Sequence, residues 1–161
     1  MDRNLFITLF LFLFLIYLGC PCQGSEDALL IVEVQAESKK EEVLHLQMKE
    51  GSTLTLTYTQ SLFLTQQKEF YTIRAGGLIL REISFGNLEA ANYYDSNPRG
   101  VIHPEGSLWK INPSCPVHFP ALRMRIPYTV HMGLIINGSI VWTPREKDRG
   151  ALLIVRTTPD Q

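Results

Sequence analysis

The sequence predicts an all-β domain, built as a small antiparallel β-sandwich or a partly open barrel, behind an N-terminal signal or anchor segment. Residues 53–59 alternate threonine with Leu54, Leu56 and Tyr58, which is the two-residue period of a strand with one buried face. Asn137 and Gly138 lie between two apolar runs, and this is the strongest short-range signal for a hairpin. No helical period of useful length follows residue 25, so short strands at regular spacing favour a sandwich or a barrel.

The remaining elements follow from the pattern along the chain. Strands are predicted over residues 28–34, 44–48, 53–59, 69–74, 78–83, 107–111 and 151–156, with a hairpin over residues 134–142. The charged residues 39–42 predict a solvated turn, and the glycine pair after Ala75 predicts a tight hairpin turn. Residues 86–106 are rich in Asn, Asp, Ser, Pro and Gly and predict a long loop. The prolines between residues 112 and 127 predict edge or irregular structure.

Residues 1–24 are interpreted as a signal peptide, a lipoprotein signal or a short membrane anchor. The apolar run from Leu5 to Leu18 is about 14 residues long, which matches a signal-peptide core and falls short of the roughly 20 residues that span a bilayer. Gly19 before Cys20 resembles a bacterial lipobox, with Cys20 as the lipidation site; cleavage near Gly24 and an uncleaved anchor are the alternatives. Each route predicts an extracytoplasmic chain, periplasmic or at the outer face of the membrane, that meets the membrane through this segment.

The cysteines depend on which route applies. If Cys20 is lipidated, Cys22 and Cys115 remain and are able to pair in an oxidising compartment. If cleavage follows Gly24, Cys115 is alone and is predicted to be a small buried hydrophobe.

The composition is that of a globular protein, with 45% hydrophobic and 19% charged residues. The formal net charge is −1, so no global field draws nucleic acid to the chain, and no nucleic-acid partner is predicted. Arg123 and Arg125 are alternate residues of one strand face and make a small basic feature. The glycosylation sequon at Asn137 is explained by its hairpin turn.

No motif for a metal, a cofactor or a catalytic nucleophile is complete. Cys115 and His118 have ligand-like spacing, but a structural zinc site needs four ligands and no second pair stands nearby. The chain has neither a Gly-x-Ser-x-Gly elbow nor a phosphate-binding loop. No cofactor and no metal are therefore predicted.

Glu69 and Glu82 are the most informative polar pair. A two-residue turn at Ala75 and Gly76, or one residue later, puts both carboxylates on the core face of the same sheet. Two like charges on that face need a compensating Arg, a shared proton or a ligand. A longer turn or fraying would instead separate the two carboxylates.

Several short motifs resemble the family named domain of unknown function 1850, over about residues 30 to 157. These motifs are Tyr58 to Leu62 with the following Glu69, Leu80 to Glu82, Phe85 to Ala91, Arg125 to Pro127, Leu134 to Gly138, and Gly150 to Leu152. Gln60 stands where the family has His, and Thr65 and Gln66 stand where it has Thr-Pro. Gln60 keeps a hydrogen bond and loses the titratable charge.

The resemblance implies a small extracytoplasmic protein encoded beside a TRAP-type transporter permease of the TAXI class. Gln60 shares the parity of Tyr58, so we expect these two residues to form one polar binding cluster with Glu69 and Glu82, with Ser61 at the rim. Tyr93 and Tyr94 are the predicted interface residues. The predicted function is a non-enzymatic accessory or binding module of the transporter, with a permease subunit as partner. A structural envelope lipoprotein, or a hydrolase using the Glu69/Glu82 pair, is the alternative.

Overall fold

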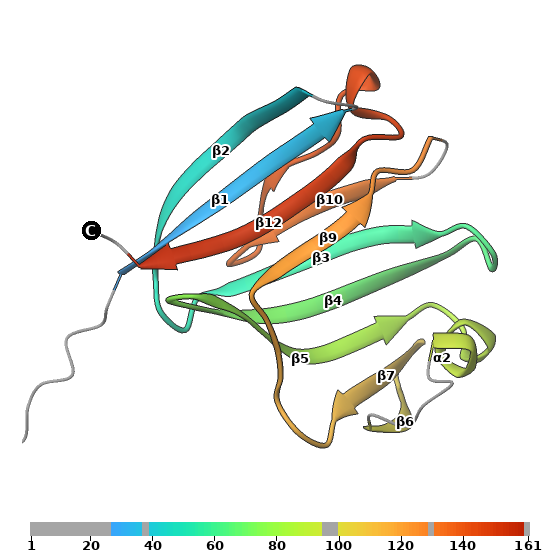
Figure 1. Cartoon of the computed structure of the whole chain (residues 1–161). Coiled ribbons are helices and arrows are strands. Elements are labelled where there is room, and N and C mark those ends of the chain that lie inside the picture. Colours follow the sequence, from blue (N-terminus) through green and yellow to red (C-terminus); the bar gives the residue numbers. More distant parts are fainter. Residues whose placement is uncertain (1–26, 37–38, 95–99, 129–130, 160–161) are drawn as a thin grey trace, which may run out of the picture.

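The computed structural model describes residues 27–36, 39–94, 100–128 and 131–159, and in it two antiparallel sheets face one another as a β-sandwich (Figure 1). The predicted fold class is confirmed, and the sheets do not close into a barrel. The four-stranded sheet has the order β2 (Lys39–Lys49), β1 (Asp27–Ala36), β12 (Leu152–Pro159) and β9 (Ala121–Arg125). The eight-stranded sheet has the order β11 (Ser139–Trp142), β10 (Met132–Ile136), β3 (Thr53–Gln60), β4 (Thr65–Arg74), β5 (Gly77–Phe85), β7 (Leu108–Pro113) and β6 (Gly100–Glu105), and β8 (Val117–Phe119) also pairs with β5.

The core lies between the two sheets, where the apolar residues of every second strand position meet. From the four-stranded sheet, β1 contributes Ala28, Leu30, Val32 and Val34, which are 0 to 4% exposed. From the eight-stranded sheet, β3, β5 and β10 contribute Leu54, Leu56, Leu78, Leu80, Leu134 and Ile136. The alternation read from the sequence at 53–59 therefore marks a real inner face, because each strand exposes one face and buries the other.

Two predictions about the connections are wrong. Lys39 to Glu42 are not a turn but belong to β2, since pairing with β1 continues from Val34 opposite Glu41 to Ala36 opposite Lys39. Residues 86–106 are not one long loop. They contain helix α2 (Leu88–Tyr94), capped where the Asn87 side chain accepts a hydrogen bond from the Ala90 amide, and the edge strand β6.

The proline-rich stretch 112–127 is irregular in part, as predicted. It also contains β8 and β9, and β9 is an edge strand of the four-stranded sheet. Neither strand contains a proline, because Pro116, Pro120 and Pro127 lie in the connections around them. The short 3₁₀ helix η1 (Glu146–Asp148) follows β11.

The two ends of the sandwich differ. At one end the Thr157 hydroxyl of β12 donates to the Arg74 carbonyl, 2.7 Å away, and so joins the β4–β5 turn to the facing sheet. β1 begins at this end, because Asp27 and Ala28 lie near Pro159 in the register. At the other end β1, β3, β5 and β9 finish, and α2 lies there next to β5 and β7 of the eight-stranded sheet (Figure 1). We call this second end the α2 end.

No helix in the described ranges combines the length and the apolar character that crossing a membrane requires.

The predicted hairpin at Asn137 and Gly138 is confirmed. Ile136 pairs with Ser139 across a two-residue turn, and the φ angles of Asn137 and Gly138 are 46° and 86°. Both values are left-handed, as a type I′ turn demands. The hairpin lies at the margin of its sheet, because β11 is the edge strand.

Replacing Gly138 with Val tests this turn. No atom lies within 4 Å of a Cβ built at Gly138, so the cost is conformational, and we expect a loss of about 1–3 kcal/mol in the free energy of unfolding. Urea unfolding followed by far-ultraviolet circular dichroism measures it. Ser139→Val adds the same side chain at the next position, which is in a strand, and serves as the control. Equal effects of the two changes would contradict the turn assignment.

Candidate functional site

Glu69 is the buried centre of a polar cluster on the inner face of β4. The same face of that strand carries Gln67 and Tyr71, two residues away on either side. Across the β3–β4 ladder, Tyr58 lies opposite Gln67 and Leu56 lies opposite Glu69. Gln67, Glu69 and Tyr71 are 1%, 6% and 3% exposed, so the cluster is part of the core.

Three side chains donate hydrogen bonds to the Glu69 carboxylate. The Tyr58 hydroxyl donates to Oε1 at 2.8 Å, and the Gln67 amide donates to the same oxygen at 3.0 Å. The Tyr71 hydroxyl donates to Oε2 at 2.5 Å. Hydrogen bonds to a charged acceptor are among the stronger ones in proteins, and here they replace the water that burial removes.

The cluster holds a carboxylate without a cation. Within the described part of the chain, no Lys, Arg or His forms an ion pair with Glu69. Burial, and then the negative charge of Glu69, raise the pKa of the Tyr58 hydroxyl far above its usual range, and the same causes act on the pKa of Tyr71. Both hydroxyls therefore stay protonated and remain donors.

Gln60 and Gln67 add acceptors that the described part of the chain does not satisfy. The side-chain oxygens of both residues are buried and have no hydrogen-bond partner. Gln60 ends β3 on the face that carries Tyr58, as predicted from its parity, and pairs with Thr65. Two buried acceptor oxygens therefore remain open, and they suit a group that brings N–H or O–H donors, such as an ammonium, an amide or a water.

The prediction that Glu82 joins this cluster is wrong. The turn lies at Ala75 and Gly76, as expected, and Tyr71 pairs with Leu80, but the register shifts beyond that pair so that Phe70 faces Glu82 and Glu69 faces Ile83. Arg81 is the extra residue of this β-bulge, and it turns Glu82 to the outer face.

On the outer face, the Glu82 carboxylate binds the Lys110 ammonium at 2.9 Å, and Lys110 also binds Glu105 at 2.8 Å. The two carboxylates of the predicted pair lie on opposite sides of the sheet. The hydrolase hypothesis loses the paired acids on which it depended.

The rim of the cluster is an exposed apolar surface. Ser61 begins the β3–β4 turn and is exposed, and Leu62 and Leu64 in that turn are 60% and 77% exposed. Tyr93 and Tyr94 of α2 are 64% and 40% exposed. The Phe63 and Tyr93 rings meet edge to face with their centroids 5.7 Å apart, so turn and helix lie side by side. We call Leu62, Phe63, Leu64, Tyr93 and Tyr94 the aromatic patch.

The other sequence-predicted sites are placed as follows. Cys115 is exposed, which corrects the prediction that a lone Cys115 would be buried. His118 lies in β8, and across the described ranges no three His, Cys, Asp or Glu side chains gather as a metal site would need. Cys20, the predicted lipidation site, and Cys22, the predicted partner of Cys115, lie outside the described residues.

Sequence reasoning missed two members of the cluster and three of the patch. Gln67 and the Tyr71 hydroxyl share the two-residue spacing of Glu69, so the strand period carried the signal for both. Leu62, Phe63 and Leu64 are adjacent apolar residues in a turn, which is itself a sign of a contact surface.

No protein-family model matches the chain, and neither the curated proteins nor the solved structures include a match to it.

The same substitution on the two faces tests the cluster. Glu69→Gln replaces a buried carboxylate that accepts three hydrogen bonds with an amide, whose NH2 group must then point at one of the former donors. We therefore expect a loss of about 2–3 kcal/mol in the free energy of unfolding. Glu82→Gln removes a half-buried ion pair and should cost about 1 kcal/mol or less. Urea unfolding at neutral pH measures both. A larger cost for Glu82→Gln than for Glu69→Gln would contradict the placement of the two carboxylates.

Alkaline pH tests the tyrosines. The pKa values of Tyr58 and Tyr71 are raised in the folded chain, so their contribution to stability is complete below the unfolded value of about 10 and is lost as pH rises above it. Each hydroxyl should lower the free energy of unfolding by about 1.4 kcal/mol per pH unit there. Urea unfolding between pH 9 and 11 should show a flatter slope for Tyr58→Phe by about that amount. An unchanged slope would mean that Tyr58 ionises freely in the folded chain.

Proposed function

We propose that this chain is an extracytoplasmic, non-enzymatic accessory module of a solute transporter, and that it docks on its partner through the aromatic patch. The observation that supports this most is the patch itself. Four of its side chains are 40% or more exposed, and they gather at one end of the sandwich. Exposed apolar side chains that cluster in this way are typical of contact surfaces, and aromatic residues are the usual anchors.

The backbone at Leu64 supports a contact role. Its φ angle of 49° is left-handed, a conformation that costs a non-glycine residue roughly 1 kcal/mol and that Gly or Asn adopt more readily. A large apolar side chain there is 77% exposed and contributes little to the core. Folding alone does not explain a leucine at this position, whereas a partner surface that receives it does.

The polar cluster supports the patch from beneath. Tyr94 packs against the fully buried Phe85, with ring centroids 5.5 Å apart. Phe85 in turn pairs with Gln67 of the polar cluster across the β4–β5 ladder. A patch mounted on these buried residues is held in shape before it binds, which lowers the entropy lost on docking.

The predicted N-terminal membrane segment and the family resemblance are the reasons for proposing a transporter as the partner. The patch is small against a standard interface of about 1,600 Å², so the intrinsic affinity is expected to be weak. An N-terminal segment held at the membrane would raise the local concentration of a membrane-bound partner and compensate for that weakness. The resemblance to domain of unknown function 1850 points to a permease subunit as this partner.

Crosslinking in the native membrane tests the proposal. The unaltered chain should crosslink to a permease subunit, and Tyr93→Ala with Tyr94→Ala should lower the yield about tenfold, because two interface anchors are lost. Ile140→Ala is the control, since Ile140 is 70% exposed on β11 and lies outside the patch. Leu64→Asn is a second variant that relieves the backbone and leaves the contact of Tyr94 with Phe85 in place.

Each outcome decides the proposal. Loss of the permease crosslink in both patch variants, with the Ile140 variant unchanged, supports it. Recovery of the chain alone, or equal yields from all variants, overturns it and favours a structural envelope role.

A further inference from the structure

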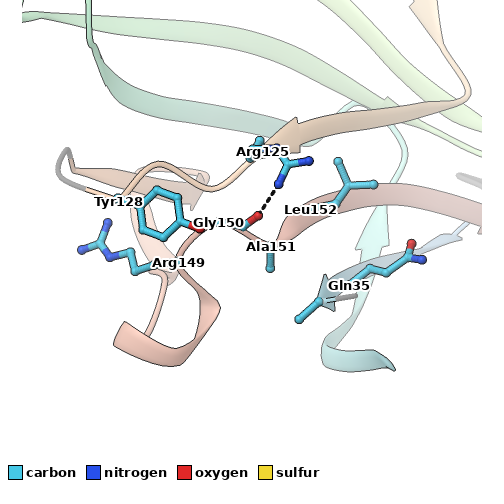
Figure 2. Close-up of a pocket in the computed structure, with 8 residues that line it drawn as sticks. Gln35, Arg125, Tyr128, Arg149, Gly150, Ala151 and Leu152 are labelled. Atoms are coloured by element: carbon cyan, nitrogen blue, oxygen red, sulfur yellow. Dashed lines mark hydrogen bonds between the residues drawn. The ribbon is translucent and has the colours of Figure 1, made fainter. Parts of the chain in front are cut away.

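A second site lies at the α2 end, on the four-stranded sheet. A pocket of about 730 Å³ opens between the end of β1, the end of β9 and the start of β12 (Figure 2). This volume is in the range of small-molecule sites. The pocket is lined by Gln35, Ala36, Arg125, Tyr128, Arg149, Gly150, Ala151 and Leu152. Among the described residues that line the pocket, the two charged ones are both arginines.

We propose that this pocket, the Arg125 pocket, binds a small molecule through a carboxylate or phosphate group, with Arg125 as the direct ligand. The proposal does not depend on the partner of the aromatic patch. A guanidinium presents a planar fork of donors that matches an oxyanion, and it stays charged at any physiological pH.

Arg125 is positioned and still has donors to offer. Its Nη1 donates to the Gly150 carbonyl at 2.6 Å, the dashed bond in Figure 2, and this bond holds the side chain across the pocket wall. That contact uses one of five N–H donors. In the described part of the chain Arg125 forms no ion pair, and its side chain is exposed.

Tyr128 adds a hydroxyl to the same wall. A Cβ built at Gly150 would lie 2.0 Å from the Tyr128 hydroxyl oxygen, and the φ angle of Gly150 is +77°, so only glycine lets the phenol settle there. Figure 2 shows the Tyr128 ring beside Gly150, with Arg149 on its other side. The Arg149 side chain is held by a bond from Nη1 to the Pro127 carbonyl at 2.9 Å, and it supplies a second positive charge.

Acidic side chains described on the neighbouring elements lie beside cations. Asp148 is bound by Arg145, and Glu41 of β2 is bound by Arg145 and Lys147. Glu146 is 3.8 Å from Arg149 Nε, and it is 94% exposed, so water screens that pair strongly. The described charged groups that line the pocket are thus both positive, although the whole chain carries a net charge of −1.

Titration calorimetry of the full-length chain in a nonionic detergent at low ionic strength tests the proposal. The probes are inorganic phosphate, succinate, and the short-chain lipids dihexanoyl-phosphatidylglycerol and dihexanoyl-phosphatidylcholine. We expect saturable binding of at least one anionic probe and none of phosphatidylcholine. Binding of phosphate or succinate assigns the site to a small solute, and binding of phosphatidylglycerol alone assigns it to a lipid headgroup.

Two variants separate the pocket from general charge. Arg125→Gln should weaken binding about tenfold or more, because it removes the charged donors that face the pocket. Arg123→Gln removes the same charge two residues away on the exposed face of β9, outside the pocket lining, and should change affinity less than twofold. Tyr128→Phe, which removes only the hydroxyl, should weaken binding by about threefold. Thermal melts confirm that each variant is folded. Equal effects of Arg125→Gln and Arg123→Gln, or no saturable binding of any anionic probe, would overturn the proposal.

Discussion

The bulge in β5 is the constraint on which the α2 end depends. The apolar residues of β5 that face the core are Leu78, Leu80, Ile83 and Phe85, and the step from Leu80 to Ile83 is three residues instead of two. A regular strand with a period of two would bury Glu82 and Ser84 on the core side and expose Ile83 and Phe85. One extra residue at Arg81 removes that conflict, because it lets both halves of the strand bury their apolar side chains.

The rest of the candidate site follows from that bulge. It leaves Glu69 as the single carboxylate of the inner face among the residues described on β4 and β5, so two tyrosine hydroxyls and one amide are enough to serve it. It also turns Phe85 inward, where it receives Tyr94 and fixes α2 against the sheet. The aromatic patch stands on this arrangement. A polar cluster within a core is costly unless its donors and acceptors are matched, and the remaining oxygens of Gln60 and Gln67 mark where the match is incomplete.

The two surfaces of the α2 end differ in chemistry because the two sheets end differently there. The eight-stranded sheet ends in the β3–β4 turn and α2, which present leucine and tyrosine side chains to the outside. The four-stranded sheet ends in Arg125 and the segment around Arg149 and Gly150, where a glycine with positive φ lets Tyr128 lie on the backbone. An apolar surface suits a macromolecular contact, and a cationic pocket suits a small anion. One end of the fold thus presents two surfaces of different chemistry, and these are the two for which we propose binding roles.

The sequence by itself determined the fold class, most strands and the Asn137 hairpin. These depend on local physics: the two-residue period of a half-buried strand, and the left-handed backbone that an Asn-Gly turn supplies. It also placed Gln60 on the face of Tyr58, since both belong to one regular strand, and it selected Tyr93 and Tyr94, which are exposed as expected.

The tertiary structure alone decided which polar residues meet. Counting alternate residues from the turn put Glu82 on the inner face, and this was wrong because the count assumed a strand without a bulge. The three-residue step between the apolar residues Leu80 and Ile83 was visible in the sequence. The loops near residues 39 and 86 were misassigned, because pairing with β1 and β7 supplies hydrogen bonds that composition does not reveal. The Arg125 pocket joins residues from β1, β9 and β12 that lie far apart in sequence, and only the packing of the sheets brings them together.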